Sequence, residues 1–286
     1  MILAGPACIP CLKRQVWRAL ERVCTDLRER QRIAEQLYTE LEQADPNVPP
    51  PVISRSLHRR LGQMTGSTDP YRLDKARQNE FLLTLLPQLR QELKTADDPL
   101  GLAIRMAIAG NAIDVGAPTD LISDTLLGSL SRAVSWPVQG PVADLRSTLS
   151  EADEILYLAD NAGEIVLDRL LIEQLPTKRV VVAVRGRPIL NDATLSDAYA
   201  AGIHELAEIM ASDSDLPGTL LADCSEQFRS RLSAADLVIA KGQGNLETLY
   251  GEKGPIWFLL QIKCQTVADI TGYPIGSLVV LPNPAR

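Results

Sequence analysis

The sequence predicts an α/β protein with a Rossmann-like, mostly parallel sheet, flanking helices and an N-terminal helical region. Residues 11 to about 135 carry apolar side chains at three- and four-residue spacings, as amphipathic helices do. After about residue 150, short apolar runs alternate with amphipathic segments, which is typical of parallel strands joined by covering helices. We therefore expect a helical region over 1–150 and a Rossmann-like domain over 151–286.

The helical region divides at its prolines and glycines. Helical spacing is clear in "LKRQVWRALERV" and "RQRIAEQLYTELEQA", and it resumes after the Pro-rich loop "DPNVPPP". Residues 69–116 read as helical, with breaks predicted near Pro87 and Pro99. Residues 133–154 are expected to form a connection that contains one short helix.

Six apolar runs are candidate strands in the second part of the chain. They are residues 154–160, 179–186, 204–210, 236–242, 256–263 and 277–283. The first, second and fourth have the Val-, Ile- and Leu-rich composition of strands buried on both faces. The third run, "HELAEIM", is a weak strand pattern.

Composition excludes several classes of protein. The 286 residues are 45% hydrophobic and 23% charged, as in an ordinary globular protein. A net charge of -7 argues against a general nucleic-acid binder. No run approaches the ~18 apolar residues that span a bilayer. Five scattered cysteines do not suggest a secreted disulfide framework, and the N-terminus is a poor signal peptide. We expect a cytoplasmic protein without a membrane partner.

Polar residues follow four of the predicted strands. They are Asp160 with Asn161, Arg185 with Asn191 and Asp192, Lys241 to Asn245, and Lys263. Because ligands bind at the carboxyl ends of the strands in an open parallel sheet, these side chains are expected to meet there. Each group alone also reads as a turn, a helix cap or a solvated lysine. Their joint occurrence at successive strand ends favours a functional site.

The residue types at these ends suit a divalent cation and a phosphate. Asp160, Asn161 and Asp192 offer hard oxygen ligands of the kind that Mg²⁺ or Mn²⁺ prefers. Lysines at 241 and 263 would supply positive charge to a phosphate. The glycines at 242 and 244 would let backbone N–H groups approach its oxygens. The combination predicts metal-assisted hydrolysis of a phosphate ester.

Four segments resemble the metal-dependent damage-control phosphatases, a former family of unknown function also labelled acidic-residue-methyltransferase-like. They are "LADNAGEIVLDRLLIEQL", "RGRPILNDAT", "DLVIAKGQGNLETL" and "LLQIKCQTVA". The N-terminal "CIPCLKRQ" and the "AGNAIDVG" segment are similar to the archaeal and bacterial branch, which carries Cys-x-x-Cys. The resemblance implies a helical region packed on a Rossmann-like domain, a divalent ion such as Mn, Mg, Co or Ni, and hydrolysis of small phosphorylated metabolites such as sugar phosphates.

The resemblance also implies roles for individual residues. The metal ligands would be Asp160, Asn161 and Asp192, and the catalytic residues Asp160, Asp192 and Lys241. Expected near substrate are Asn111, Asp114, Glu164, Gly242, Gly244, Asn245 and Lys263. Sequence does not separate a water nucleophile from Asp160 itself.

Alternatives remain open for several of these residues. The pair Asn111 and Asp114 could instead form a buried cap network, and Glu164 could cap a helix. Asp168 is expected to be structural, and the arginines at 185 and 187 read equally well as surface residues. His58 and His204 match no motif.

The cysteines at 8 and 11 could form a reactive pair activated by a helix start, or could be two small residues at a helix entry.

Two other functions compete with a phosphatase. The first is S-adenosylmethionine-dependent methylation of a carboxylate, although the turn after the first strand has one glycine where several are expected. The second is a non-catalytic metal- or nucleotide-binding module. The physiological substrate, the preferred metal and the oligomeric state are not set by the sequence.

Overall fold

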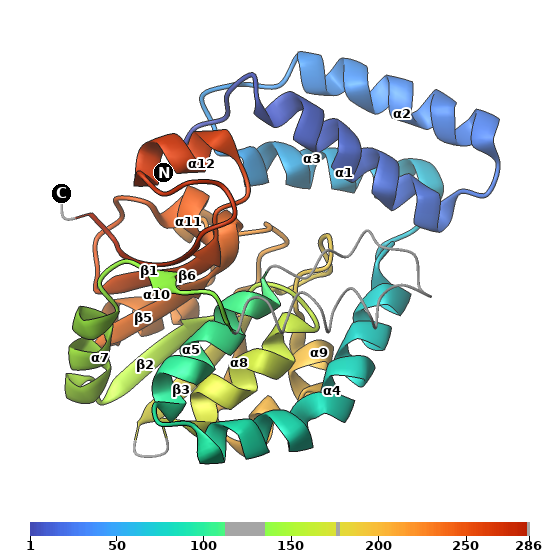
Figure 1. The fold of residues 1–286 in the computed structure, drawn as a ribbon. Helices are drawn as coiled ribbons and strands as arrows, with labels where there is room; N and C mark the ends of the chain where they lie inside the picture. The colour runs from blue at the N-terminus through green and yellow to red at the C-terminus, as the bar shows by residue number, and fades with distance from the viewer. Residues whose placement is uncertain (112–134, 176–177, 285–286) are drawn as a thin grey trace.

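A seven-stranded sheet forms the centre of the molecule (Figure 1). The computed structural model describes residues 1–111, 135–175 and 178–284. The strands are β1 (Val138–Gln139), β2 (Glu154–Leu158), β3 (Arg179–Val184), β4 (Glu208–Ala211), β5 (Leu237–Lys241), β6 (Ile256–Gln261) and β7 (Leu278–Pro282). Their order is β1-β7-β6-β5-β2-β3-β4, and among these neighbours only β6 and β7 run antiparallel. The predicted mostly parallel α/β sheet is confirmed.

All six predicted apolar runs contain a strand. The weak third run yields only the short β4, because its first part forms the 3₁₀ turn η2 (Ile203–Glu205). Strand β1 was not expected, and it pairs two residues with β7 at the edge of the sheet. The predicted short helix in the same connection is α7 (Val142–Glu151).

Helices cover both faces of the sheet. One core gathers residues of α4 (Arg72–Thr95), α5 (Pro99–Gly110), α7, α8 (Glu164–Glu173) and α9 (Leu195–Ala200). The opposite core gathers residues of α10 (Glu226–Ala234), α11 (Gly242–Leu249) and α12 (Gln265–Thr271). Successive side chains of β2 alternate between them: Ile155 and Tyr157 enter the first core, while Leu156 and Leu158 enter the second. This period of two explains why the strand sequences read as continuous apolar runs.

The first three helices form a separate layer with a core of their own. They are α1 (Cys8–Val23), α2 (Leu27–Glu42) and α3 (Pro50–Thr65), and their apolar stripes face one another. Asp26 caps the start of α2, and Gly66 ends α3 with a φ of 73°. The helices α4, α5 and α7, which precede residue 150 or end beside it, share a core with the sheet instead. The expected domain division at residue 150 stays a prediction.

One helix break predicted from proline is wrong. Helix α4 continues through Pro87, which lies on its exposed side. The helix loses one backbone hydrogen bond there, but its buried stripe of Leu82, Leu86, Leu89 and Leu93 holds it against the sheet layer. The break predicted near Pro99 is present. Helix α4 ends at Thr95, and Pro99 is the first residue of α5, after the capping residue Asp98.

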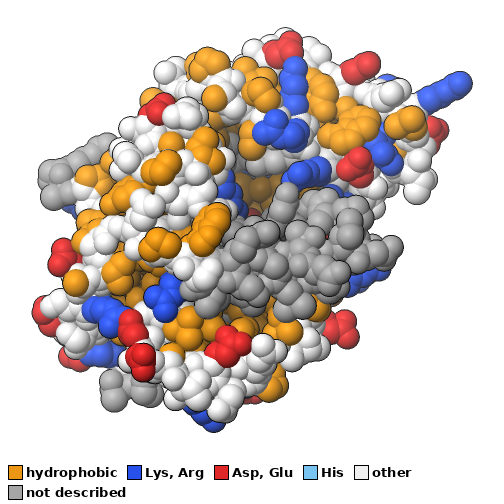
Figure 2. Space-filling model, viewed as in Figure 1, with side chains coloured by type: hydrophobic (Ala, Val, Ile, Leu, Met, Phe, Trp, Pro, Cys, Tyr) orange, Lys and Arg blue, Asp and Glu red, His pale blue; other side chains and the backbone are white. Residues whose placement is uncertain are grey.

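The space between the α1–α3 layer and the sheet layer is hollowed. Figure 2 shows this hollow, with Lys and Arg side chains beside it. Among the described residues, none of the helices combines the length and the apolar character needed to cross a membrane.

Candidate active site

Backbone pairing brings the two acidic junctions together. Asp160 and Asn161 lie between β2 and α8, and Asp192 lies in the loop after β3. Asn161 and Asp192 form an isolated antiparallel bridge, and the backbone N–H of Ala193 donates to the carbonyl of Asp160 at 2.7 Å. The predicted convergence of these junctions is therefore built into the main chain.

The three side chains line one cavity of about 250 Å³ beneath α1 and α3. Lys263 lies at the exposed rim of the same cavity. Asn161 Nδ2 donates to Asp160 Oδ2 at 3.0 Å, so its Oδ1 is the atom that an ion would use. Within the described ranges, no three His, Cys, Asp or Glu side chains group as ligands of one ion. The candidate set depends on an amide oxygen, and such a hard donor set fits Mg²⁺ or Mn²⁺.

Electrostatics at this cavity favour a cation. Burial, followed by the nearby carboxylates of Asp192 and Glu164, raises the pKa of Asp160 to about 8. Burial also raises the pKa of Asp192, although Arg185 opposes the shift. Carboxylates held together away from water are stabilised as anions when a metal ion joins them.

Arg185 belongs to the site, and its interpretation as a surface residue is wrong. Only 2% of its surface is exposed, and its Nε donates to Asp192 Oδ2 at 2.6 Å. Its Nη2 lies 3.6 Å from Asp160 Oδ1, and Asn245 Oδ1 accepts from its guanidinium at 3.4 Å. The guanidinium thus orients both acidic side chains. The available signal was its position at the carboxyl end of β3, where it directly follows the strand.

Asn245, predicted to contact substrate, is fully buried behind the cavity. Besides accepting from Arg185, it donates to the carbonyl of Lys241 at 2.7 Å. Its Oδ1 also accepts from Thr219 Oγ1 at 2.8 Å. In this structure Asn245 acts on the site through Arg185, and a direct contact with substrate stays a prediction.

Lys241 lies below the cavity and does not line it. Its ammonium is fully buried and donates to the carbonyl of Ala107, to Glu164 Oε1 at 2.7 Å and to Asp168 Oδ1. Burial lowers the pKa of Lys241, but the carboxylates of Asp168 and Glu164 more than reverse this and raise it. Tyr157 donates to Asp168 Oδ1 at 2.7 Å, which is consistent with a structural Asp168. The predicted contact of Lys241 with phosphate stays a prediction.

Glu164 and Asn111 connect this buried layer to the metal ligands. Asn111, at the end of α5, donates from Nδ2 to Asp160 Oδ2 at 2.9 Å and to Glu164 Oε2 at 3.1 Å. Glu164 Oε2 also accepts from Asn161 at 3.0 Å. Glu164 is the first residue of α8, yet its carboxylate accepts hydrogen bonds from these two amides and from Lys241. Asp114 lies outside the described residues.

The two glycines of the 241–245 turn permit close packing. Gly242 has a φ of +75°, and a Cβ built there would lie 1.8 Å from Asp160 Oδ2. A Cβ at Gly244 would lie 2.2 Å from the carbonyl oxygen of Pro217. These contacts explain both glycines without a phosphate, so the predicted approach of their N–H groups to substrate stays a prediction.

We expect Gly242→Ala to displace Asp160 and to lower the affinity for a divalent ion at least about tenfold, the scale of losses in metal-site support. The matched control is Gly272→Ala, whose φ is +77° but whose Cβ would meet nothing within 4 Å. Both variants carry a left-handed backbone penalty of about 1–2 kcal/mol. Calorimetric ion titration separates the two effects, and equal ion affinity in both variants would contradict the role of Gly242.

The thiol pair lies at the same cavity as the candidate metal ligands. Cys8 and Cys11 occupy the first turn of α1 and line the cavity with Cys264 and the buried Glu247. Burial raises the pKa of both Cys8 and Cys11, which favours the alternative of two small residues at a helix entry over that of a reactive pair.

Comparisons with known proteins find relatives along most of this chain. The model of the "damage-control phosphatase ARMT1-like domain" matches residues 4–279. The chain is 36% identical to an uncharacterized protein of Methanocaldococcus jannaschii, over 96% of this chain and 94% of that protein. It is 34% identical to a damage-control phosphatase of Archaeoglobus fulgidus, over 79% of this chain and 80% of that protein.

Pyrococcus horikoshii supplies both a sequence relative and a solved structure. Its damage-control phosphatase is 31% identical over 96% of each chain. The crystal structure of its DUF89 family protein matches with a TM-score of 0.88 and 28% identity, covering 99% of this chain and all of that one. Matched along nearly its whole length, this chain belongs to the damage-control phosphatase ARMT1-like family.

Proposed function

We propose that this chain is a divalent-metal-dependent phosphatase that hydrolyses phosphomonoesters of small metabolites as a form of metabolite damage control. Relatives named damage-control phosphatases support the phosphatase activity. The observation that carries the proposal is the convergence of Asp160, Asn161 and Asp192 on one cavity with a lysine at its rim. Two carboxylates and one neutral amide suit an ion that must also accept an anionic substrate.

Each residue then has a physical task. Asp160, Asn161 and Asp192 would hold the ion, which when bound polarises a phosphoryl oxygen and offsets its charge. Arg185 fixes both carboxylates, and Lys263 offers a cation to the phosphate oxygens from the rim. Catalysis here consists mainly of positioning and charge stabilisation.

Lys241 contributes from below. It holds Glu164, whose other oxygen accepts hydrogen bonds from Asn111 and Asn161. Those amides also donate to Asp160 Oδ2. We therefore assign Lys241 and Glu164 as positioning residues that set the orientation of Asp160.

Purified protein is expected to release phosphate from 4-nitrophenyl phosphate with Mn²⁺, Mg²⁺, Co²⁺ or Ni²⁺. Removal of the ion by a chelator should abolish release, and adding the ion back should restore it, because without the ion nothing at the site polarises the phosphoryl oxygen or offsets its charge. Phosphate release that survives complete chelation would refute the metal role. Absence of release with every ion, together with tight binding of S-adenosylmethionine, would favour methyl transfer instead.

A further inference from the structure

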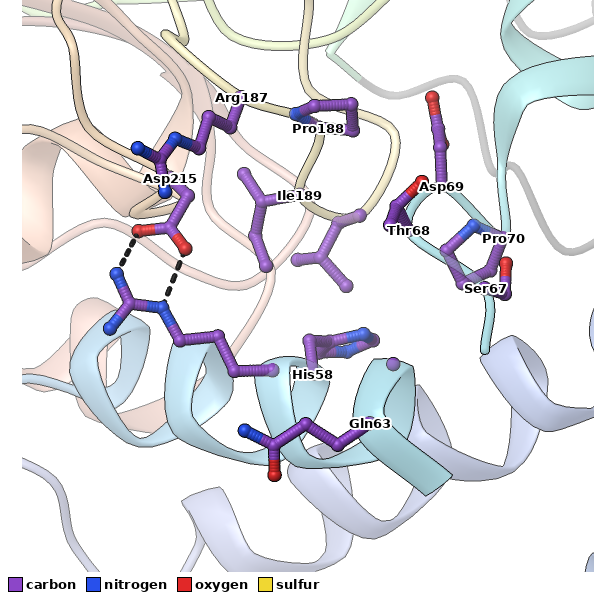
Figure 3. A pocket seen from close by; sticks show the side chains of 13 residues that line it. His58, Gln63, Ser67, Thr68, Asp69, Pro70, Arg187, Pro188, Ile189 and Asp215 are labelled. Carbon is purple, nitrogen blue, oxygen red and sulfur yellow. Dashed lines mark hydrogen bonds and ion pairs between the residues drawn. The ribbon is translucent and has the colours of Figure 1, made fainter. Parts of the chain in front are cut away.

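A second cavity of about 420 Å³ lies beside the candidate active site (Figure 3). We call it the His58 chamber, and define it by α3, the turn at 67–70 and the loop at 187–190. Figure 3 shows His58 on the helix, facing the loop that carries Pro188 and Ile189, with Pro70 at one side. This volume is in the range of cavities that bind small molecules.

The chamber and the active-site cavity are neighbours along one helix. Ser54 of α3 lines the active-site cavity, and His58, one turn further, lines the chamber. Leu190 lines both, and the next two residues of the same loop lead to Asp192. A molecule bound at the candidate metal ligands therefore has the chamber next to it, with the side chain of Leu190 between.

Most charged groups of the chamber are already paired. Arg59 donates to both carboxylate oxygens of Asp215, at 2.6 and 2.7 Å. Asp69 forms an ion pair with Lys75 at 3.0 Å. Arg187, the remaining charged residue of the lining, is exposed. Because the other charges are neutralised, and because prolines and aliphatic side chains make up much of the wall, the chamber suits an uncharged, largely apolar group.

His58 supplies one polar atom that the protein does not use. The residue is only 9% exposed, and within the described part of the chain its Nε2 has no hydrogen-bond partner. Burial lowers the pKa of His58 to about 4, so the imidazole is neutral at pH 7. A buried polar atom without a partner is unfavourable. Because Nε2 itself has almost no exposed surface, a bound group would reach it only when the imidazole turns toward the chamber, and the hydrogen bond formed there would remove the penalty.

We propose that the His58 chamber receives the organic part of the substrate, while its phosphate sits at Asp160, Asn161 and Asp192. The inference rests on the proposed function and refines its substrate class. The preferred substrates are phosphomonoesters with an extended organic group, whose far end is apolar and carries one uncharged hydrogen-bonding group. Compact phosphate esters would reach the ion but leave the chamber unfilled.

The test uses the two histidines of the chain as reporters. Protein with ¹⁵N-labelled histidine and Mg²⁺ is titrated with two phosphonates that cannot be hydrolysed, methylphosphonate and (6-hydroxynaphthalen-2-yl)methylphosphonate. The naphthyl compound should shift the imidazole signals of His58 and leave those of His204, outside the chamber, unchanged. Methylphosphonate should bind without moving the His58 signals.

Two variants test the contact directly. Gln63→Trp places a bulky side chain at the chamber wall. It should lower the affinity for the naphthyl compound at least about tenfold and leave the affinity for methylphosphonate unchanged. Ser56→Trp, at an exposed position of the same helix outside the chamber, is the control and should change neither affinity. His58→Phe keeps an aromatic ring at this position but removes the hydrogen-bonding nitrogen. It should lower the affinity for the naphthyl compound about two- to tenfold.

The outcomes separate the two proposals. If the naphthyl compound binds but the His58 signals stay unmoved and Gln63→Trp has no effect, the organic group lies elsewhere and the chamber assignment is wrong. If neither phosphonate binds in the presence of Mg²⁺, the proposed phosphate site fails, and the chamber assignment fails with it.

Discussion

Asp160→Asn and Asp192→Asn should each abolish metal-dependent phosphate release, with a loss on the order of 10³-fold or more. Changes to groups that only support a metal ligand commonly lower activity about 10- to 100-fold, and these two residues are proposed to bind the ion directly. The measurement is initial-rate phosphate release at saturating Mn²⁺, with ion affinity determined in parallel. Asp144→Asn, the same chemical change on the exposed face of α7, is the control and should keep full activity.

Stability separates this loss from unfolding. The pKa of Asp160 is raised to about 8, so without an ion the folded protein holds this carboxyl protonated at pH 7, and asparagine resembles that neutral form. The metal-free Asp160→Asn protein should therefore be at least as stable as wild type in urea unfolding. Turnover close to wild type in both aspartate variants would end the metal-site proposal.

Lys241→Met should reduce the free energy of unfolding by about 3–5 kcal/mol, the typical result of removing one partner from a buried ion pair. The substitution keeps the chain length but leaves Glu164 and Asp168, both fully buried in their side chains, without their cation. Urea unfolding at pH 7 gives the change directly. Phosphate release should also fall, because Glu164 no longer holds the amides that orient Asp160.

Two further variants make the Lys241 prediction specific. Lys263→Met removes a lysine from the exposed rim, and its effect on stability should stay within about 0.5 kcal/mol. Lys241→Met combined with Asp168→Asn should recover part of the lost stability, since one uncompensated carboxylate is gone. An unchanged unfolding free energy in Lys241→Met would mean that the buried charges are neutral in the folded protein.

The sequence predicted which residues meet, because parallel strands place their carboxyl ends along one edge of the sheet. The sequence did not predict how deeply each side chain is buried or which face of the sheet it points to. Lys241 follows Ile239 by two residues, so both point to the α5–α8 face, whereas Ala240 points to the other face. The alternation is visible in the sequence, but which parity faces which helices is decided only by tertiary packing.

Other misses have similar causes. Arg185 looked like a surface residue because arginine is rarely buried, and only the carboxylates around it make its burial favourable. His58, which has a role only in the proposed chamber, matched no motif because no spacing relates it to Asp160 and Asp192, which lie far away in the chain. Pro87 was expected to break α4, yet the helix continues because its buried leucine stripe contributes more than one backbone hydrogen bond.

The formal charge of the connected side chains at and below the cavity also bears on which ion the proposed site would bind. Four carboxylates, those of Asp160, Asp192, Glu164 and Asp168, share the cluster with the cations Arg185 and Lys241, which leaves a formal total of -2 when all are ionised. A doubly charged ion brings the cluster to zero, whereas Na⁺ or K⁺ would leave one negative unit facing an incoming dianion. If the proposed site binds an ion, this charge balance should favour a divalent over a monovalent ion before ionic radius or ligand geometry contributes.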